Sequence, residues 1–217
     1  MTIAQVVQLL YNIVDRVYIG HLPENASYAL AGLGLTFPLI TIILAVTNLF
    51  GMGGAPLFSI ARGRGDNSRA ERIMGNTFAM LCIWGVILMI LCFVFMKPLL
   101  YLFGASDITY PYAAEYMMIY SFGIPFSMIA TGMNGFINAQ GFAKSGMATV
   151  LVGAVTNIIL DPVFIFIFNM GVAGAALATI ISQFLSAVWV LSFFRGRRTM
   201  FRLNKNDMKI ELPLIKE

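Results

Sequence analysis

Six long apolar segments constrain the fold more than any other feature of the sequence. They cover about residues 2–20, 28–61, 73–96, 110–139, 146–168 and 171–194. A helix needs about 20 apolar residues to cross the hydrocarbon core of a bilayer, and each segment is of that order. Charged residues make up only 11% of the chain, against about 25% in a soluble domain, so no water-soluble surface can cover these segments. The sequence predicts an all-α integral membrane protein whose residues 1–194 form a bundle of six transmembrane helices.

The basic residues fall in alternate connections between these segments. Twelve of the fourteen lie in the 61–72 loop, at Lys144, or in the tail over residues 195–217. The intervening loops hold only Lys97, and Arg16 lies inside the first segment. Because basic loops tend to stay in the cytoplasm, both termini are predicted to be cytoplasmic. The position of the basic residues is then explained by membrane orientation, so we expect no nucleic-acid partner. We interpret residues 195–217 as a basic cytoplasmic linker.

Two carboxylates interrupt the apolar segments, where ionisable groups are costly and usually functional. Asp15 shares one helix face with Gln8 and Asn12, at i, i+4 and i+7 spacing, and Tyr11 lies beside that stripe. The second carboxylate, Asp161, shares a face with Asn157 one turn earlier. The sequence therefore predicts polar stripes on the first and the fifth helix.

The depth of these residues predicts that they meet. Asp161 and Thr179 lie about 8 and 9 residues on either side of the short connection at 169–170, and Asp15 lies about 6 residues from His21. All three therefore fall at similar depth. Pro162 has no N–H, which frees the carbonyl of Ile158 close to Asp161. Such a corner would suit a cation.

Carboxylates that lie close together away from water either take up a proton or recruit a cation. We therefore predict a site for Na⁺ or H⁺ at Asp15, Asn157, Asp161 and Thr179. The alternative is a structural polar cluster in which a basic residue neutralises Asp15. No catalytic or nucleotide-binding motif is present, and the single histidine, His21, lacks a partner at metal-ligand spacing. We expect no enzyme activity and no cofactor beyond the bound Na⁺ or H⁺.

Small residues recur within the apolar segments. Gly174, Ala178 and Ser182 follow one another at four-residue spacing, which is typical of closely packed membrane helices. The runs 51–54 and 132–135 are also similar to each other: each consists of a glycine, a methionine, a variable residue and a glycine. The abundant Phe, Met and Tyr side chains would suit bulky amphipathic cations if the bundle encloses a cavity.

Five stretches of the chain resemble the MATE (multidrug and toxic compound extrusion) transporters. They are YNIVDRVYIG at 11–20, AGLG at 31–34, NAQG at 138–141, NIILDP at 157–162 and GVAGAALAT at 171–179. The resemblance implies two six-helix lobes around a central cavity. It implies antiport across the cytoplasmic (plasma or inner) membrane, in which Na⁺ or H⁺ enters as drugs or organic cations leave.

By the same resemblance, Asp15, Asn157, Asp161 and Thr179 would form the coupling-cation site of the N-terminal lobe. Gln8, Tyr11 and Asn12 would face the substrate cavity. Since the chain holds six apolar segments and not twelve, we expect it to be an N-terminal half whose partner is a second lobe or a second copy of itself. Two alternatives remain open: a lipid-linked saccharide flippase of a related family, and a membrane subunit or remnant that does not transport.

Overall fold

The computed structural model describes residues 14, 17–21, 26–196 and 199–203. Residues 17–20 are helical, and five long helices follow: α2 (Ala26–Gly63), α3 (Asn67–Leu102), α4 (Tyr110–Ala139), α5 (Ala143–Pro162) and α6 (Gly171–Arg195). A π-helix, η1 (Val163–Ile167), continues α5. Within the described residues the prediction of an all-α membrane protein is confirmed, because α2, α3, α5 with η1, and α6 are each long and apolar enough to cross a membrane.

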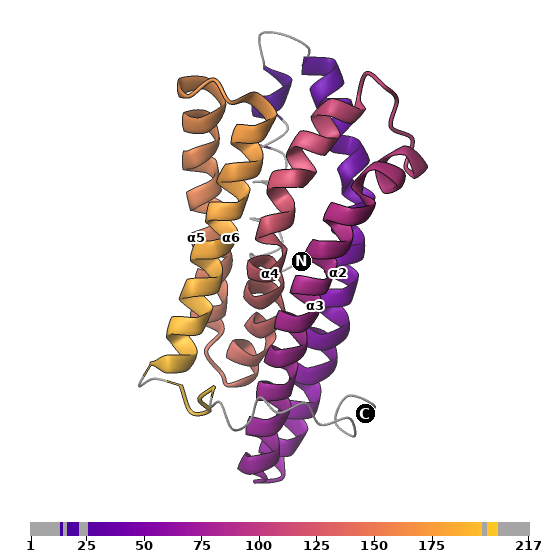
Figure 1. The fold of residues 1–217 in the computed structure, drawn as a ribbon. Coiled ribbons are helices and arrows are strands. Elements are labelled where there is room, and N and C mark those ends of the chain that lie inside the picture. The colour runs from indigo at the N-terminus through magenta and orange to yellow at the C-terminus, as the bar shows by residue number, and fades with distance from the viewer. Residues whose placement is uncertain (1–13, 15–16, 22–25, 197–198, 204–217) are drawn as a thin grey trace.

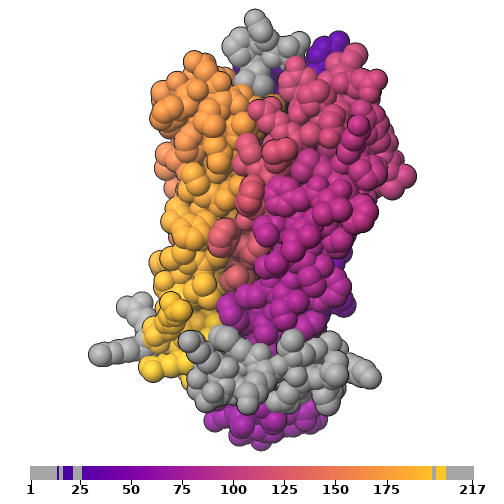
Figure 2. Space-filling model, in the orientation of Figure 1, coloured from indigo at the N-terminus to yellow at the C-terminus, as the bar shows by residue number. Residues whose placement is uncertain are grey.

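Helix α4 forms the centre of the bundle. It lies between the α2–α3 pair and the α5–α6 pair (Figure 1), and it packs more extensively on α2, α3 and α6 than the outer helices pack on one another. At the surface in this view it appears as a strip between α6 and α3 (Figure 2). Because neighbouring helices surround it, α4 can be less apolar than helices that face lipid, and it is the one long helix outside the four candidate spans of the described chain.

Glycines let α2 and α4 touch through their backbones. A Cβ on Gly51 would lie 2.8 Å from the Cα of Gly132, and a Cβ on Gly132 would lie 2.6 Å from Cδ1 of Leu81 on α3. The two similar runs at 51–54 and 132–135 therefore meet at one helix crossing. Their likeness reflects a shared packing role, as expected for small residues between membrane helices.

The turns that carry the basic residues lie at one end of the bundle. The α2–α3 turn, the α4–α5 turn and the last residues of α6 share that end, whereas the loops at 103–109 and 168–170 lie at the other (Figure 1). The predicted loop over residues 61–72 was too long. Gly65 turns the chain with a φ of 77°, and the Asp66 carboxylate accepts a hydrogen bond from the Arg69 N–H at 3.0 Å, so α3 already begins at Asn67.

A short segment after α6 docks onto this end of the bundle. In this strap, defined as residues 199–201, the Thr199 hydroxyl and the N–H groups of Met200 and Phe201 donate to Oε1 of Gln140 at 2.8, 3.1 and 3.3 Å. The Phe201 ring packs edge-on against Phe58 of α2 with ring centroids 5.1 Å apart. The strap therefore connects the end of α6 to α2 and α4.

Candidate functional site

Three of the four residues predicted for the cation site lie together between α5 and α6. The Asn157 amide donates to Oδ1 of Asp161 at 3.1 Å and reaches Oγ1 of Thr179 at 3.5 Å. The Thr179 hydroxyl donates in turn to the carbonyl of Ala175 at 3.0 Å. Asp161 is fully buried and Asn157 is 2% exposed. One helical turn on α5 and a tight connection to α6 are enough to bring these residues together.

The chemistry of this cluster fits a small hard cation or a proton. A carboxylate, an amide carbonyl and a hydroxyl are oxygen ligands of the kind that such cations prefer. Oδ1 of Asn157 is buried and has no hydrogen-bond partner among the described residues, so it can accept a hydrogen bond or coordinate a cation. Protonation of the buried carboxylate is the alternative way to remove its charge.

The backbone beside Asp161 departs from a regular α-helix. The Val163 N–H donates to the carbonyl of Leu160, and the Phe168 N–H donates to the carbonyl of Val163 at 3.0 Å, which is the five-residue step of a π-helix. Single π-helical turns are frequent at functional sites. The expectation that the Ile158 carbonyl joins the cation corner stays a prediction.

The other predicted site residues, Gln8, Tyr11, Asn12 and Asp15, lie outside the described residues. The described end of their segment, residues 17–21, contacts η1, the π-helix that follows Asp161. The Tyr18 ring packs edge-on against Phe166 of η1 with centroids 6.0 Å apart, and Ile19 is fully buried.

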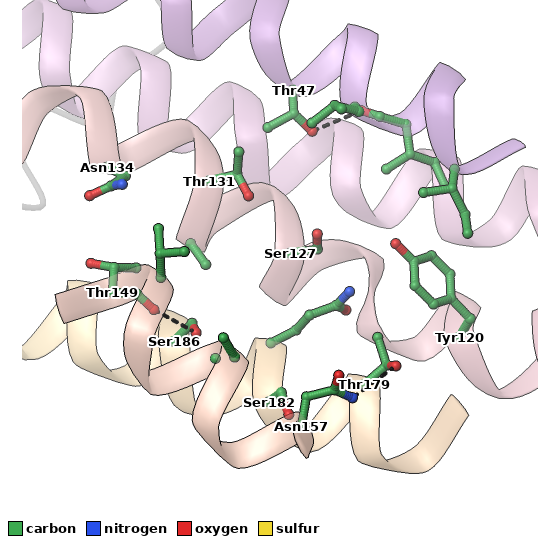
Figure 3. A pocket seen from close by; sticks show the side chains of 18 of the residues that line it. Thr47, Tyr120, Ser127, Thr131, Asn134, Thr149, Asn157, Thr179, Ser182 and Ser186 are labelled. Atoms are coloured by element: carbon green, nitrogen blue, oxygen red, sulfur yellow. Dashed lines mark hydrogen bonds between the residues drawn. The ribbon is translucent and has the colours of Figure 1, made fainter. Parts of the chain in front are cut away.

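A cavity of about 480 Å³ separates the α2–α4 wall from the α5–α6 wall. Figure 3 shows Asn134 and Thr149 toward one end and Tyr120, Asn157 and Thr179 toward the other. The described lining holds no acidic, basic or histidine side chain; its polar members are hydroxyls and amides: Thr41, Thr47, Tyr120, Ser127, Thr131, Asn134, Asn138, Thr149, Asn157, Thr179, Ser182, Gln183 and Ser186. The polar cluster of Asn157, Asp161 and Thr179 therefore borders a neutral polar cavity.

Sequence reasoning missed most of this lining. Hydroxyls in apolar helices give a weak signal because each can bond to its own backbone, as Thr47 does to the carbonyl of Ile43 at 2.8 Å and Ser182 to that of Ala178 at 2.7 Å. A stronger signal was available in Asn134 and Asn138, two amides at i and i+4 within an apolar segment.

The fold and the site together define a class: a multi-pass helical membrane protein with a buried polar cluster beside an intramembrane cavity, an arrangement that is common in membrane transporters. The model of the MatE family matches residues 1–163. The chain therefore belongs to the MatE family, and the resemblance found in the sequence is confirmed.

Relatives and solved structures agree with this assignment. The whole chain is 26% identical to the multidrug export protein MepA of Staphylococcus haemolyticus (strain JCSC1435) and 27% identical to MepA of Staphylococcus aureus (strain MRSA252), and it covers 48% of each. It superposes with a TM-score of 0.90 on an outward-facing multidrug resistance MATE family transporter of the MOP superfamily, at 27% identity, with all of this chain and 48% of the other covered.

A MOP superfamily transporter from Pyrococcus furiosus, whose description reports a binding pocket of reverse polarity and suggests a different function, gives a TM-score of 0.89 at 27% identity. That alignment covers 98% of this chain and 47% of the other. The chain thus spans about half the length of the relatives that it matches.

Proposed function

We propose that the chain is the N-terminal lobe of a cation-coupled antiporter that exports drugs or other organic cations across the cytoplasmic membrane. The observation that carries the proposal is the junction of the Asp161–Asn157–Thr179 cluster with the 480 Å³ cavity. A cation that binds the cluster lies at the edge of the space available to a substrate. The similarity to multidrug export proteins supports drug-like substrates.

Coupling follows from the charge of Asp161. While this carboxylate is ionised it attracts a positively charged substrate, because a charge acts strongly in a poorly solvated site. Binding of Na⁺ or H⁺ cancels the charge, weakens that attraction and favours release. Asp15 would complete the site from the first helix, and Gln8, Tyr11 and Asn12 would contact substrate. The packing of Tyr18 on Phe166 supports this arrangement, since it joins the end of that segment to η1.

Both termini are proposed to be cytoplasmic. The gathering of Arg62, Arg64, Lys144 and Arg195 at one end of the bundle supports this orientation through the preference of basic residues for the cytoplasm. Residues 195–217 would then leave the six-helix lobe as a cytoplasmic linker. Reporter fusions are expected to read cytoplasmic after Gly65 and external after Ser106.

A second six-helix lobe, or a second copy of this chain, would complete the transporter, because alternating access in such folds is largely the movement of one lobe against the other. A saccharide-lipid flippase would need basic groups to hold an anionic pyrophosphate, and the described cavity lining has none. A subunit without transport is the remaining alternative, and efflux measurements decide it.

The proposal is tested by Asp161→Asn in residues 1–217 expressed with a second lobe. The variant keeps the size of the side chain and one oxygen that can accept the Asn157 amide, but it carries no charge and cannot titrate. We expect an inserted protein that no longer couples dye efflux to a Na⁺ or proton gradient, whereas Asp107→Asn, a change in the outer loop, leaves coupling intact. Retained coupling in Asp161→Asn would refute the assignment, and failure to insert would indicate a structural cluster.

A further inference from the structure

Two glycines bring α6 into close contact with α5 and η1, one on each side of Asn157, Asp161 and Thr179, the proposed cation cluster. A Cβ on Gly174 would lie 2.8 and 2.9 Å from the carbonyl carbon and oxygen of Phe164, and 3.0 Å from the N of Ile165. Toward the other end of the same helix pair, a Cβ on Gly153 would lie 2.7 Å from Oγ of Ser186. The backbone opposite Gly174 leaves no room for a methyl group, whereas at Gly153 a methyl group would force the Ser186 hydroxyl, which donates to the Thr149 carbonyl at 3.1 Å, to move.

The contact at Gly174 is with backbone that cannot easily move. The Phe164 carbonyl accepts the Met170 N–H at 3.0 Å, which closes the connection between η1 and α6. A π-helical turn is also wider than an α-helical turn, since it contains an additional residue. The facing helix must therefore present a residue without a side chain, and Gly174 meets that requirement.

The cation cluster lies between these two contacts. Asn157 is one helical turn after Gly153 on α5, Thr179 is five residues after Gly174 on α6, and Asp161 precedes η1. The Asn157 amide reaches Thr179 at 3.5 Å, beyond the usual range of an N–H···O hydrogen bond. A small increase in the distance between the helices would therefore separate Thr179 from Asn157 and Asp161.

We infer that Gly153 and Gly174 are positioning residues of the cation site: they set the distance between α5 and α6 at which Asn157, Asp161 and Thr179 converge. This inference rests on the proposed function, in which that cluster binds the coupling ion. The glycines touch no ion themselves. A methyl group at either position weakens cation binding without removing a ligand.

The first test is Gly174→Ala in residues 1–217 together with a second lobe. The measurement is the Na⁺ concentration, or the pH, that gives half-maximal dye efflux. We expect the half-maximal Na⁺ concentration to rise about tenfold or more, or the pH profile to shift by about one unit, as is usual when groups that orient ligands are disturbed. The maximal rate should change far less. Gly34→Ala and Gly53→Ala are matched controls, because among the described residues a Cβ at either helical glycine meets no atom beyond its own helix backbone within 4 Å.

The second test adds a rescue, and it keeps the inference testable if Gly174→Ala fails to insert. Gly153→Ala should weaken cation affinity by less than Gly174→Ala, because the new methyl meets a side-chain hydroxyl and not backbone; adding Ser186→Ala removes that hydroxyl. The double variant should match Ser186→Ala alone. A merely structural role would lower thermal stability equally at every cation concentration, with no shift in half-maximal cation.

The outcomes separate the two proposals. Wild-type efflux that depends on neither the Na⁺ gradient nor the proton gradient would overturn the proposed coupling, and this inference with it. Coupled wild-type efflux that Asp161→Asn abolishes, together with unchanged cation affinity in Gly174→Ala or Gly153→Ala, would overturn the positioning role alone. A double variant no better than Gly153→Ala would also overturn it.

Discussion

Replacement of Gln140 by leucine should release the strap from the end of the bundle. Gln140 is 2% exposed, and its Oε1 accepts the Thr199 hydroxyl and the N–H groups of Met200 and Phe201. Gln140→Leu keeps the approximate size of the side chain and removes the acceptor. The Thr199 hydroxyl retains a second acceptor in the Phe201 carbonyl at 2.8 Å, so the effect falls on the two N–H groups.

The loss of docking free energy depends on how exposed the N–H groups of Met200 and Phe201 are. Met200 is 62% exposed, so its N–H can turn to water, and its loss is that of one ordinary hydrogen bond. Phe201 is 6% exposed, so its N–H would stay buried without a partner. One lost bond of about 1 kcal/mol and one unsatisfied buried donor of about 1–3 kcal/mol give about 2–4 kcal/mol in all. The ratio of docked to released strap should fall roughly 30- to 700-fold.

Limited proteolysis measures this equilibrium directly. Chymotrypsin can cut after Phe201 only when that ring leaves its contact with Phe58. When docking is fast relative to cleavage, the cleavage rate follows the population of the released strap. Mass spectrometry should show that cleavage after Phe201 is roughly 30- to 700-fold faster in Gln140→Leu than in the wild type, and that the increase is smaller in Thr199→Val. Equal rates in Gln140→Leu and the wild type would refute the docking energetics derived above.

Two further substitutions test other contacts. Thr179→Ala removes one neutral oxygen from the cation cluster and should raise half-maximal cation concentration a few-fold at an unchanged maximal rate; complete loss of coupling would contradict this. Gly51→Ala should lower the thermal unfolding temperature more than Gly132→Ala, because the first methyl meets the α4 backbone at 2.8 Å and the second meets the flexible Leu81 side chain. The reverse order would show that the α2–α4 crossing adjusts more readily than the Leu81 side chain.

The sequence predicts the spans and the meeting of Asn157, Asp161 and Thr179 because both depend on local rules. Apolar length marks the helices, and the spacing of Asn157 and Asp161 places them on one face whatever surrounds them. The short connection at 169–170 then forces α5 and α6 together, which is why Thr179 could be added from its distance to that connection alone.

What the sequence does not reveal depends on contacts between distant segments or on competition at helix ends. The beginning of α3 follows from the Asp66 cap and not from the apolar run. The strap contact joins Gln140 to residues about 60 positions later, and no local pattern marks it. The cavity likewise needs α2 and α4 to face α5 and α6, an arrangement that periodicity alone cannot provide.

The central place of α4 also bears on how the lobe is made. A ribosome delivers the chain from its N-terminus, so α4 is synthesised before its main partner on the far side, α6. Until then Tyr120 and Asn134 on α4 lack their opposite wall, and polar groups are poorly tolerated in lipid. Stable integration of α4 must therefore await α6, and chains that end after α5 should be substrates for membrane quality-control proteases.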